Sequence, residues 1–172
     1  MKTKYTAKHV YWDRSLLRVI NSSSLIDSAS GSRKKLPENI IRFDSIHEFK
    51  VYRELTRMFG AACVDCQVKL NILLPCICYP NGKTWKVDFG VKYFDSVDEY
   101  AFYVEAKGVF LPEFGTTLAM LEQFDPDEFD KVRIVFSRAI PKDNRVVKAL
   151  LKTSFKENLY TLSELEAMRC LK

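Results

Sequence analysis

Hydrophobic and polar positions divide the chain after residue 40 into segments with helical and strand periodicity. Apolar residues at helical spacing predict an amphipathic helix over 45–59, in which Ser45 and Glu48 form a capping box. Gly60 directly follows and predicts the end of that helix. Two runs rich in aromatic and β-branched residues flank a polar stretch at 95–99, which predicts a β-hairpin over 85–110.

The rest of the chain continues the alternation of strands and helices. The pattern predicts a helix over 116–124, a buried strand over 132–137, a helix over 144–155, an edge strand over 159–162 and a terminal helix opened by the capping box Ser163/Glu166. A helix between two strands favours a parallel crossover. The expected fold is therefore an α/β domain with a mixed four- or five-stranded sheet and helices on both sides.

The first forty residues have a different character. Residues 5–20 contain enough apolar positions for one or two strands or a short helix, and the pattern does not decide between them. Residues 21–32 are rich in serine and are typical of a loop. The predicted organisation is a basic N-terminal arm or extension over 1–40 and a core domain over 41–172.

Charge sharpens this division. The chain of 172 residues carries a net charge of +5, and residues 1–35 hold eight of its 27 basic residues but only two of its 22 acidic ones. An arm of this sign suits a polyanionic partner, and Arg33, Lys34 and Lys35 are its strongest candidates for phosphate contact. A merely solvated tail is the alternative for the lysines nearest the N-terminus.

Composition favours a cytoplasmic protein, and a bacterium or a phage-infected cell is the default expectation. A hydrophobic content of 47% is typical of a globular domain, and no apolar run reaches the 18 residues that suggest a membrane span. The basic start lacks the apolar segment of a signal peptide. We therefore expect no membrane association.

Four cysteines near the middle of the chain raise the question of zinc. A tetrahedral zinc ion needs four ligands, which could be the sulfur atoms of Cys63, Cys66, Cys76 and Cys78. The spacing of these cysteines is not that of a common zinc ribbon. Free cysteines in a reducing compartment behave as small apolar residues. Structural zinc is thus the less favoured interpretation, and the odd total of five cysteines argues against a disulfide framework.

The hairpin over 85–110 carries the chemistry. If Tyr93 pairs with Tyr100, paired residue numbers sum to 193 and Asp88 lies opposite Glu105, whereas a slip of one residue would separate their faces. Lys107 follows Glu105 by two and shares its face. Two carboxylates so close suit Mg²⁺, which can activate a water, and Lys107 can orient that water or neutralise developing charge. Ordinary solvated charges at a strand end are the alternative.

These residues also carry a resemblance. Val87-Asp88 followed by Val104-Glu105-Ala106-Lys107-Gly108 resembles the core of the PD-(D/E)xK nuclease superfamily. The run 102–110 with Arg133-Ile-Val-Phe-Ser137 is similar to phage endonuclease I, a Holliday-junction resolvase. The stretch 43–48 resembles the start of small phage nuclease-like domains of that superfamily. Val87 departs from the proline that usually precedes the aspartate.

The resemblance implies a restriction-endonuclease-like core and a divalent-metal-dependent DNA endonuclease. It implies that Asp88, Glu105 and the backbone carbonyl of Ala106 bind Mg²⁺, with Mn²⁺ as a substitute. Lys107 would assist the attacking water, and Glu48 would join the metal site. Lys86 and Arg138 are further candidates for DNA contact. Branched DNA is one expected substrate, and a homodimer would be needed to cut a junction symmetrically.

Three alternatives remain open at this stage. Transposon-end and restriction-type endonucleases share the same core, and such an enzyme would work with partner proteins of a recombination or transposition complex. A catalytically silent DNA-binding subunit would keep the fold without cutting. A zinc-stabilised interaction module would use the four central cysteines instead of the carboxylates.

Overall fold

The chain forms two units, residues 1–50 and 51–172, with their boundary inside helix α1 (Ile46–Phe59). This computed structural model describes residues 9–20, 36–77, 79–94, 96 and 99–168. The strands are β1 (Val10–Asp13), β2 (Arg18–Ile20), β3 (Ile40–Phe43), β4 (Val64–Leu73), β5 (Lys83–Lys92), β6 (Tyr100–Lys107), β7 (Val132–Phe136) and β8 (Leu159–Thr161). The other helices are α2 (Pro112–Phe124), α3 (Pro126–Asp130), α4 (Arg145–Leu150) and α5 (Leu162–Ala167), with 3₁₀ turns at Ala61–Cys63 and Ser154–Asn158.

The first unit is a small antiparallel sheet in the order β2-β1-β3. Residues 10–20, which the sequence left undecided, are two strands, and β1 also pairs with β3. The turn after β1 is held by Asp13, whose Oδ1 accepts hydrogen bonds from the Ser15 amide and hydroxyl and from Asn39 Nδ2. These bonds to its charged form, chiefly that from the Ser15 hydroxyl, lower the pKa of Asp13.

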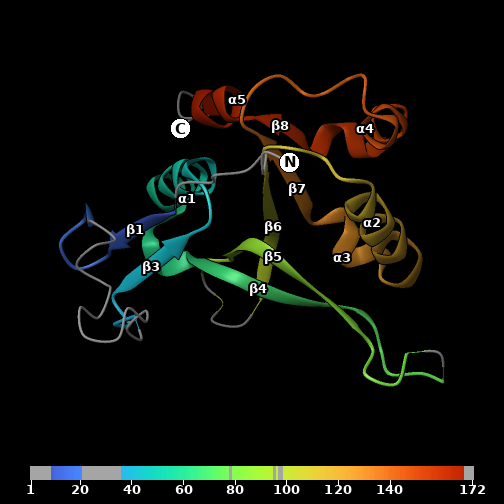
Figure 1. Ribbon diagram of the computed structural model, residues 1–172, viewed down its shortest axis with the longest axis horizontal. Helices are drawn as coiled ribbons and strands as arrows, with labels where there is room; N and C mark the ends of the chain where they lie inside the picture. Colours follow the sequence, from blue (N-terminus) through green and yellow to red (C-terminus); the bar gives the residue numbers. More distant parts are fainter. Residues whose placement is uncertain (1–8, 21–35, 78, 95, 97–98, 169–172) are drawn as a thin grey trace, which may run out of the picture. The chain divides into compact units, whose positions relative to one another are not determined.

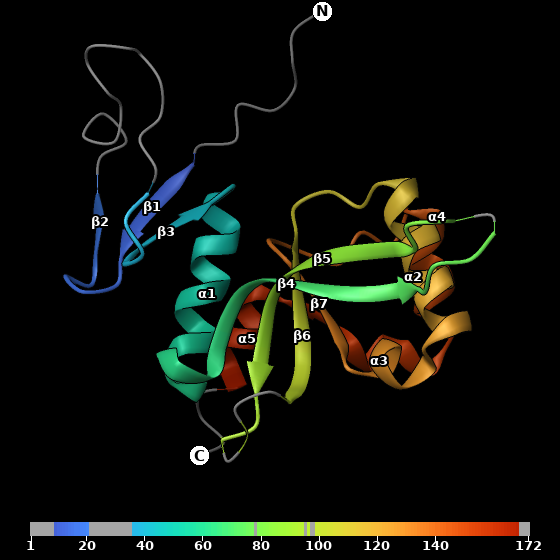
Figure 2. The same ribbon diagram turned by 90° about the horizontal axis from the view of Figure 1, so that it is seen from below.

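The second unit contains a five-stranded mixed sheet in the order β4-β5-β6-β7-β8 (Figures 1 and 2). β4, β5 and β6 are antiparallel, whereas β6, β7 and β8 are parallel to one another. Helices α2 and α3 connect β6 to β7, and α4 connects β7 to β8. The predicted α/β fold, with a mixed sheet flanked by helices, is confirmed.

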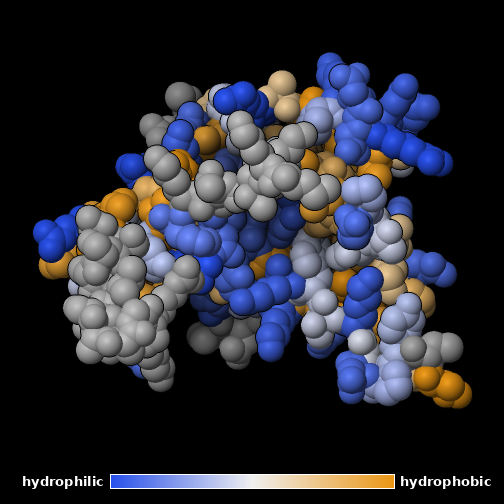
Figure 3. Space-filling model, in the orientation of Figure 1, coloured by the Kyte–Doolittle hydropathy of each residue, from blue (hydrophilic) through white to orange (hydrophobic). Residues whose placement is uncertain are grey.

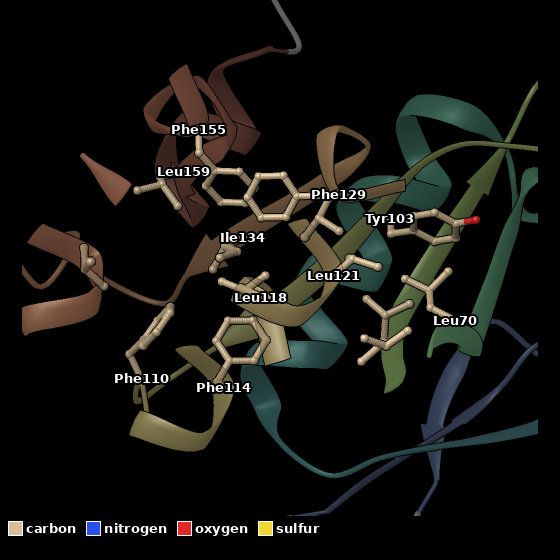
Figure 4. Packing of buried hydrophobic residues seen from close by; sticks show 14 of the residues in the cluster. Leu70, Tyr103, Phe110, Phe114, Leu118, Leu121, Phe129, Ile134, Phe155 and Leu159 are labelled. Carbon is tan, nitrogen blue, oxygen red and sulfur yellow. The ribbon is translucent and has the colours of Figure 1, made fainter. Parts of the chain in front are cut away.

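The main core lies between the sheet and the helices that follow β6 and β7 (Figure 4). Leu121 of α2, Ile134 of β7 and Val147 of α4 are fully buried there. Around them pack aromatic side chains from several elements, among them Phe110, Phe114, Phe129, Phe155 and Tyr103. This continuous apolar layer fixes the positions of α2 and α4 beside the ends of β6 and β7.

Several predicted helix boundaries were wrong. α2 begins at Pro112 rather than residue 116, because proline suits the first helical position. The stretch 126–130, whose acidic sequence is typical of a solvated turn, is helix α3, since burial of Phe129 holds it against the core. The expected helix over 144–155 ends as an α-helix at Leu150 and resumes as a 3₁₀ turn. The terminal helix is capped by Thr161 with Glu164, not by Ser163 with Glu166.

Among the described helices, none combines the length and the apolar character that a membrane crossing requires.

Candidate active site

The register of the central hairpin brings Asp88 and Glu105 together. Phe89 pairs with Val104 and Val91 with Phe102, so the paired numbers sum to 193 as the sequence predicted. The predicted pairing of Tyr93 with Tyr100 is wrong, because an irregularity near the turn pairs Lys92 with Tyr100 instead. The irregularity lies beyond Val91 and leaves the register near Asp88 unchanged.

The two strands stop pairing with each other at the carboxylates. The last pair at this end of their ladder is Phe89 with Val104. The residues of β5 before Phe89 pair only with β4, and the residues of β6 after Val104 pair only with β7. Side chains take over the bonding at this point. Glu105 Oε2 accepts a hydrogen bond from the Asp88 amide at 3.2 Å, and Asp88 Oδ2 accepts one from the Ala106 amide at 2.9 Å. Each carboxylate is thus fixed by the backbone of the opposite strand.

Lys107 completes the cluster. Its Nζ forms an ion pair with Glu105 Oε1 and lies 4.3 Å from the ring centroid of Phe114 on α2. The Glu105 side chain is 5% exposed, whereas that of Lys107 is 23% exposed. A nearly buried carboxylate is therefore held next to an ammonium that still reaches solvent.

The neighbouring strand is distorted beside this cluster. β4 pairs Cys66 with Phe89 and Val68 with Val87, and Gln67 between them has a φ of 60°. The left-handed conformation costs a residue other than glycine about 1–2 kcal/mol. Such strain is concentrated at functional sites, where the surrounding structure maintains it. Its position opposite Asp88 in the register agrees with a functional role for that carboxylate.

The donor set suits a hard divalent cation. Asp88 and Glu105 supply carboxylate oxygens and two negative charges, against which Lys107 supplies one positive charge. Mg²⁺ commonly takes only one or two carboxylates and keeps several waters. Across the described part of the chain, no group of three or more His, Cys, Asp or Glu side chains is placed to hold a metal ion. The pair of carboxylates lies below that number but within the usual range for Mg²⁺.

Glu48 lies in the first turn of α1, within the first unit. Half of the predicted capping box is confirmed, since the Glu48 amide donates to Ser45 Oγ, while the Glu48 carboxylate accepts from the Ser45 hydroxyl at Oε1. Glu48 Oε2 also accepts a hydrogen bond from the Asp44 amide at 2.9 Å. Its structural role is thus confirmed, and its predicted role at the metal stays a prediction.

The described cysteines lie at opposite ends of β4. Cys63 and Cys66 are at its beginning, while Cys76 lies beyond its end. Seven residues of strand between Cys66 and Leu73 span roughly 23 Å. One tetrahedral zinc ion, with bonds to sulfur of about 2.3 Å, cannot bridge that distance. Cys78 lies outside the described residues.

A basic surface that the sequence analysis missed begins beside Lys107. The amide of Ser137 donates to the Lys107 carbonyl, and Asn144 Nδ2 donates to the Phe110 carbonyl, so both ends of the loop after β7 lie at the site. This loop, α4 and the turn after it carry five exposed cations, here called the basic surface: Arg138, Lys142, Arg145, Lys148 and Lys152. In Figure 3 hydrophilic side chains gather over α4 at the upper right.

The sequence held a signal for this surface. Residues 138–156 contain six basic residues and one acidic residue, but the near-neutral total of the core masks the excess. Among the predicted DNA contacts, Arg138 lies on this surface and Lys86 is exposed on β5 two residues before Asp88. Arg33, Lys34 and Lys35 lie outside the described residues.

Comparison of the chain with protein-family models, with curated proteins and with solved structures finds no match.

Proposed function

We propose that the protein is a divalent-metal-dependent DNA endonuclease. The observation that carries the proposal is the cluster of Asp88, Glu105 and Lys107 at the point where β5 and β6 part. Two carboxylates fixed by opposite strands and an adjacent ammonium are the groups that metal-assisted phosphodiester hydrolysis requires. The resemblance to the PD-(D/E)xK superfamily assigns the same residues to that chemistry.

Each residue has a distinct task in this mechanism. Asp88 and Glu105, with the Ala106 carbonyl as a further ligand, would hold the ion, which activates water and stabilises charge on the phosphoryl oxygen when bound. The Ala106 amide fixes Asp88 in place, and the Asp88 amide fixes Glu105. Lys107 orients the attacking water and neutralises the charge that develops on the phosphate.

The basic surface supports DNA as the substrate. Its five cations start directly beside Lys107 and continue along α4, so a strand cut at the cluster would have its neighbouring phosphates next to them. Phosphate contacts give affinity without sequence preference and make binding depend on salt. Replacing Arg145 and Lys148 by alanine is expected to lower the salt slope of DNA binding by about one for each phosphate that is no longer neutralised.

Cleavage assays with matched variants test the proposal. Supercoiled plasmid, linear duplex, single strand and four-way junction are incubated with Mg²⁺ or Mn²⁺ and wild type, Asp88→Asn, Glu105→Gln or Lys107→Met. Asp130→Asn is the control, because Asp130 is an exposed carboxylate that precedes β7, at the other end of the sheet. We expect metal-dependent cutting that all three site variants lose and the control keeps.

The outcomes distinguish the alternatives. DNA binding without cutting in wild type would favour a silent DNA-binding subunit, or an enzyme that needs partner proteins of a recombination or transposition complex. Preferred cutting of the junction would favour a resolvase, which must act as a two-fold dimer. Solution mass measured with and without junction DNA then decides that point, since a strict monomer rules the resolvase out.

A further inference from the structure

Strands β4 and β5 extend beyond the rest of the sheet as a two-stranded ribbon. We call residues 69–77 and 79–86 the ribbon; Cys78 between them lies outside the described residues. Figure 1 shows its connecting turn reaching away from the remainder of the second unit. One face of the ribbon is anchored, because Leu70 and its cross-strand partner Trp85 face the core and the Trp85 ring contacts Phe114 of α2 at 5.4 Å between ring centroids. The ribbon is thus an arm whose base packs against the core.

Near its base, the other face of the ribbon carries cations and neutral polar groups. Lys69 lies directly opposite Lys86, Asn71 lies opposite Thr84, and all four are exposed. Between Asp65 and Asp88 the sequence contains no acidic residue. Like charges placed directly opposite on a sheet repel each other. Because Lys69 and Lys86 have no acidic neighbour in the ribbon, a polyanion that contacts both β4 and β5 would compensate their charges.

The tip of the ribbon is apolar where turns are usually polar. Cys76 and Tyr79 exchange two backbone hydrogen bonds of 3.0 Å, which closes a two-residue turn. Turns of this size favour Asn, Asp and Gly. Here the first turn residue is Ile77, which is 99% exposed, and Leu74 nearby is 73% exposed. Figure 3 shows hydrophobic side chains at the end of the ribbon, at the lower right.

We propose that the ribbon lies along a groove of duplex DNA and that Ile77 inserts at a base step. This inference rests on the proposed function and deepens it. β-ribbons are known readers of DNA grooves, and apolar side chains act as wedges that unstack a step. Insertion is easiest where stacking is already weak. The preferred substrate is therefore DNA with a branch, a mismatch or another defect in stacking.

The geometry predicts where the wedge acts. β5 is antiparallel to β6, so the start of β5 and the ribbon tip lie at the same end of the sheet as Lys107. Five residues of strand separate Asp88 from Lys83, which is roughly 17 Å. At about 3.4 Å per base pair, a ribbon aligned with the duplex axis places the disturbed step at least about five base pairs from the cut phosphate.

The chain offers a matched control for the wedge. Phe94 is 97% exposed and follows β5 at its other end, in a loop whose sequence is acidic. Ile77→Asn and Phe94→Asn make the same kind of change at two hairpin loops, and asparagine suits a turn in both. Only the first change should affect DNA distortion if the ribbon is the DNA-binding arm.

The test scans 2-aminopurine through a duplex bound by Asp88→Asn protein. A rise in fluorescence at one step, at least about five base pairs from the mapped cut site, is expected from unstacking. Ile77→Asn in the same background should lose the rise, and Phe94→Asn should keep it. Cleavage by otherwise wild-type protein should favour a mismatched over a matched duplex, and Ile77→Asn should bring that ratio close to one.

Different results would refute the insertion of Ile77 into DNA and the proposed nuclease activity. A signal that survives Ile77→Asn, or one lost equally in Phe94→Asn, refutes the wedge even if the enzyme cuts DNA. A signal that depends on Ile77, in a protein that cuts nothing with Mg²⁺ or Mn²⁺, supports the ribbon and refutes the nuclease. Absence of DNA binding refutes both. Self-association that Ile77→Asn abolishes, without any fluorescence rise, assigns the tip to a protein contact instead.

Discussion

Replacing Lys107 by methionine tests the electrostatic coupling in the site. The change removes the ammonium from the Glu105 carboxylate but keeps an unbranched side chain against the Phe114 ring. Breaking a buried ion pair by removing one partner costs about 3–5 kcal/mol. The Lys107 side chain is 23% exposed, so its charge was not fully buried and a value at or below the lower end of that range applies. We expect a loss of about 2–3 kcal/mol in the free energy of unfolding without metal.

Metal should restore part of this loss. The variant lacks the ammonium next to Asp88 and Glu105, so the proposed divalent ion would be the main compensation for their negative charge. An ion at ten times its dissociation constant stabilises a protein by about 1.4 kcal/mol. Mg²⁺ is added at about 10 mM, so that its concentration approaches ten times the dissociation constant. We expect the stabilisation by Mg²⁺ to be larger in Lys107→Met than in wild type, and smallest in Asp88→Asn.

The assay is thermal unfolding in EDTA and in Mg²⁺, followed by Trp85 fluorescence in a Trp12→Phe background. The protein has two tryptophans, and Trp85 packs in the second unit, so the signal reports the unit that holds the site. A loss of about 2–3 kcal/mol corresponds to roughly 4–12 °C in melting temperature. A Lys107→Met protein that melts within about 1 °C of wild type would refute the coupling. So would a variant that gains no more from Mg²⁺ than wild type does.

Three further measurements address other parts of the chain. Gly90→Ala should cost about 1–3 kcal/mol, because its new Cβ would lie 2.5 Å from the Tyr100 ring, whereas Gly108→Ala meets no atom within 4 Å and should melt like wild type. Because the pKa of Asp13 is lowered in the folded protein, its charged form stabilises the first unit above pH 3.8, and this stabilisation is lost as the pH falls below that value. Asp13→Asn should therefore make the stability of the first unit, followed by Trp12 fluorescence, less dependent on acid pH. Glu48→Gln should preserve the helix cap and the melting temperature, and if Glu48 serves the metal, cleavage falls about 10–100-fold.

The sequence predicted the central hairpin well because several signals agreed there. Apolar and polar residues alternate over the first half of β5, whereas β6 is apolar from Tyr100 to Val104, and a slip of one residue would have put Glu105 on the wrong face. Only the pairing of Tyr93 with Tyr100 failed, because the strands shift register next to the turn. The shift is confined to the end of the ladder next to the turn, so the pairing of Phe89 with Val104 keeps the predicted register.

Helix ends were less predictable because two local signals competed. Thr161 and Ser163 each precede a glutamate by three residues, so both match a capping box. Strand β8 runs through Thr161, and pairing with β7 places the helix start directly after it. The stretch 125–130 is similar, since its acidic residues suggest a turn, whereas packing of the buried Phe129 ring on Phe155 makes it helical. Tertiary packing decided both cases.

The distribution of charge along the sheet connects the site with both proposed DNA-binding surfaces. At the end far from Lys107, cations are matched by carboxylates, with Lys92 paired to Asp65 at 2.9 Å and Lys131 to Glu128 at 2.6 Å. At the site end, no ion pair within the described part of the chain involves the basic surface, Lys69 or Lys86.

Cations that lack neighbouring carboxylates repel one another. A surface that only faces solvent would therefore be expected to balance its cations at both ends of the sheet. A phosphate backbone that passes the carboxylate cluster would compensate both groups of cations at once. The same backbone would also bring a phosphodiester to Glu105 and Lys107. The charge asymmetry, the splayed strands and the apolar ribbon tip therefore favour one ligand, a duplex that lies across the end of the sheet.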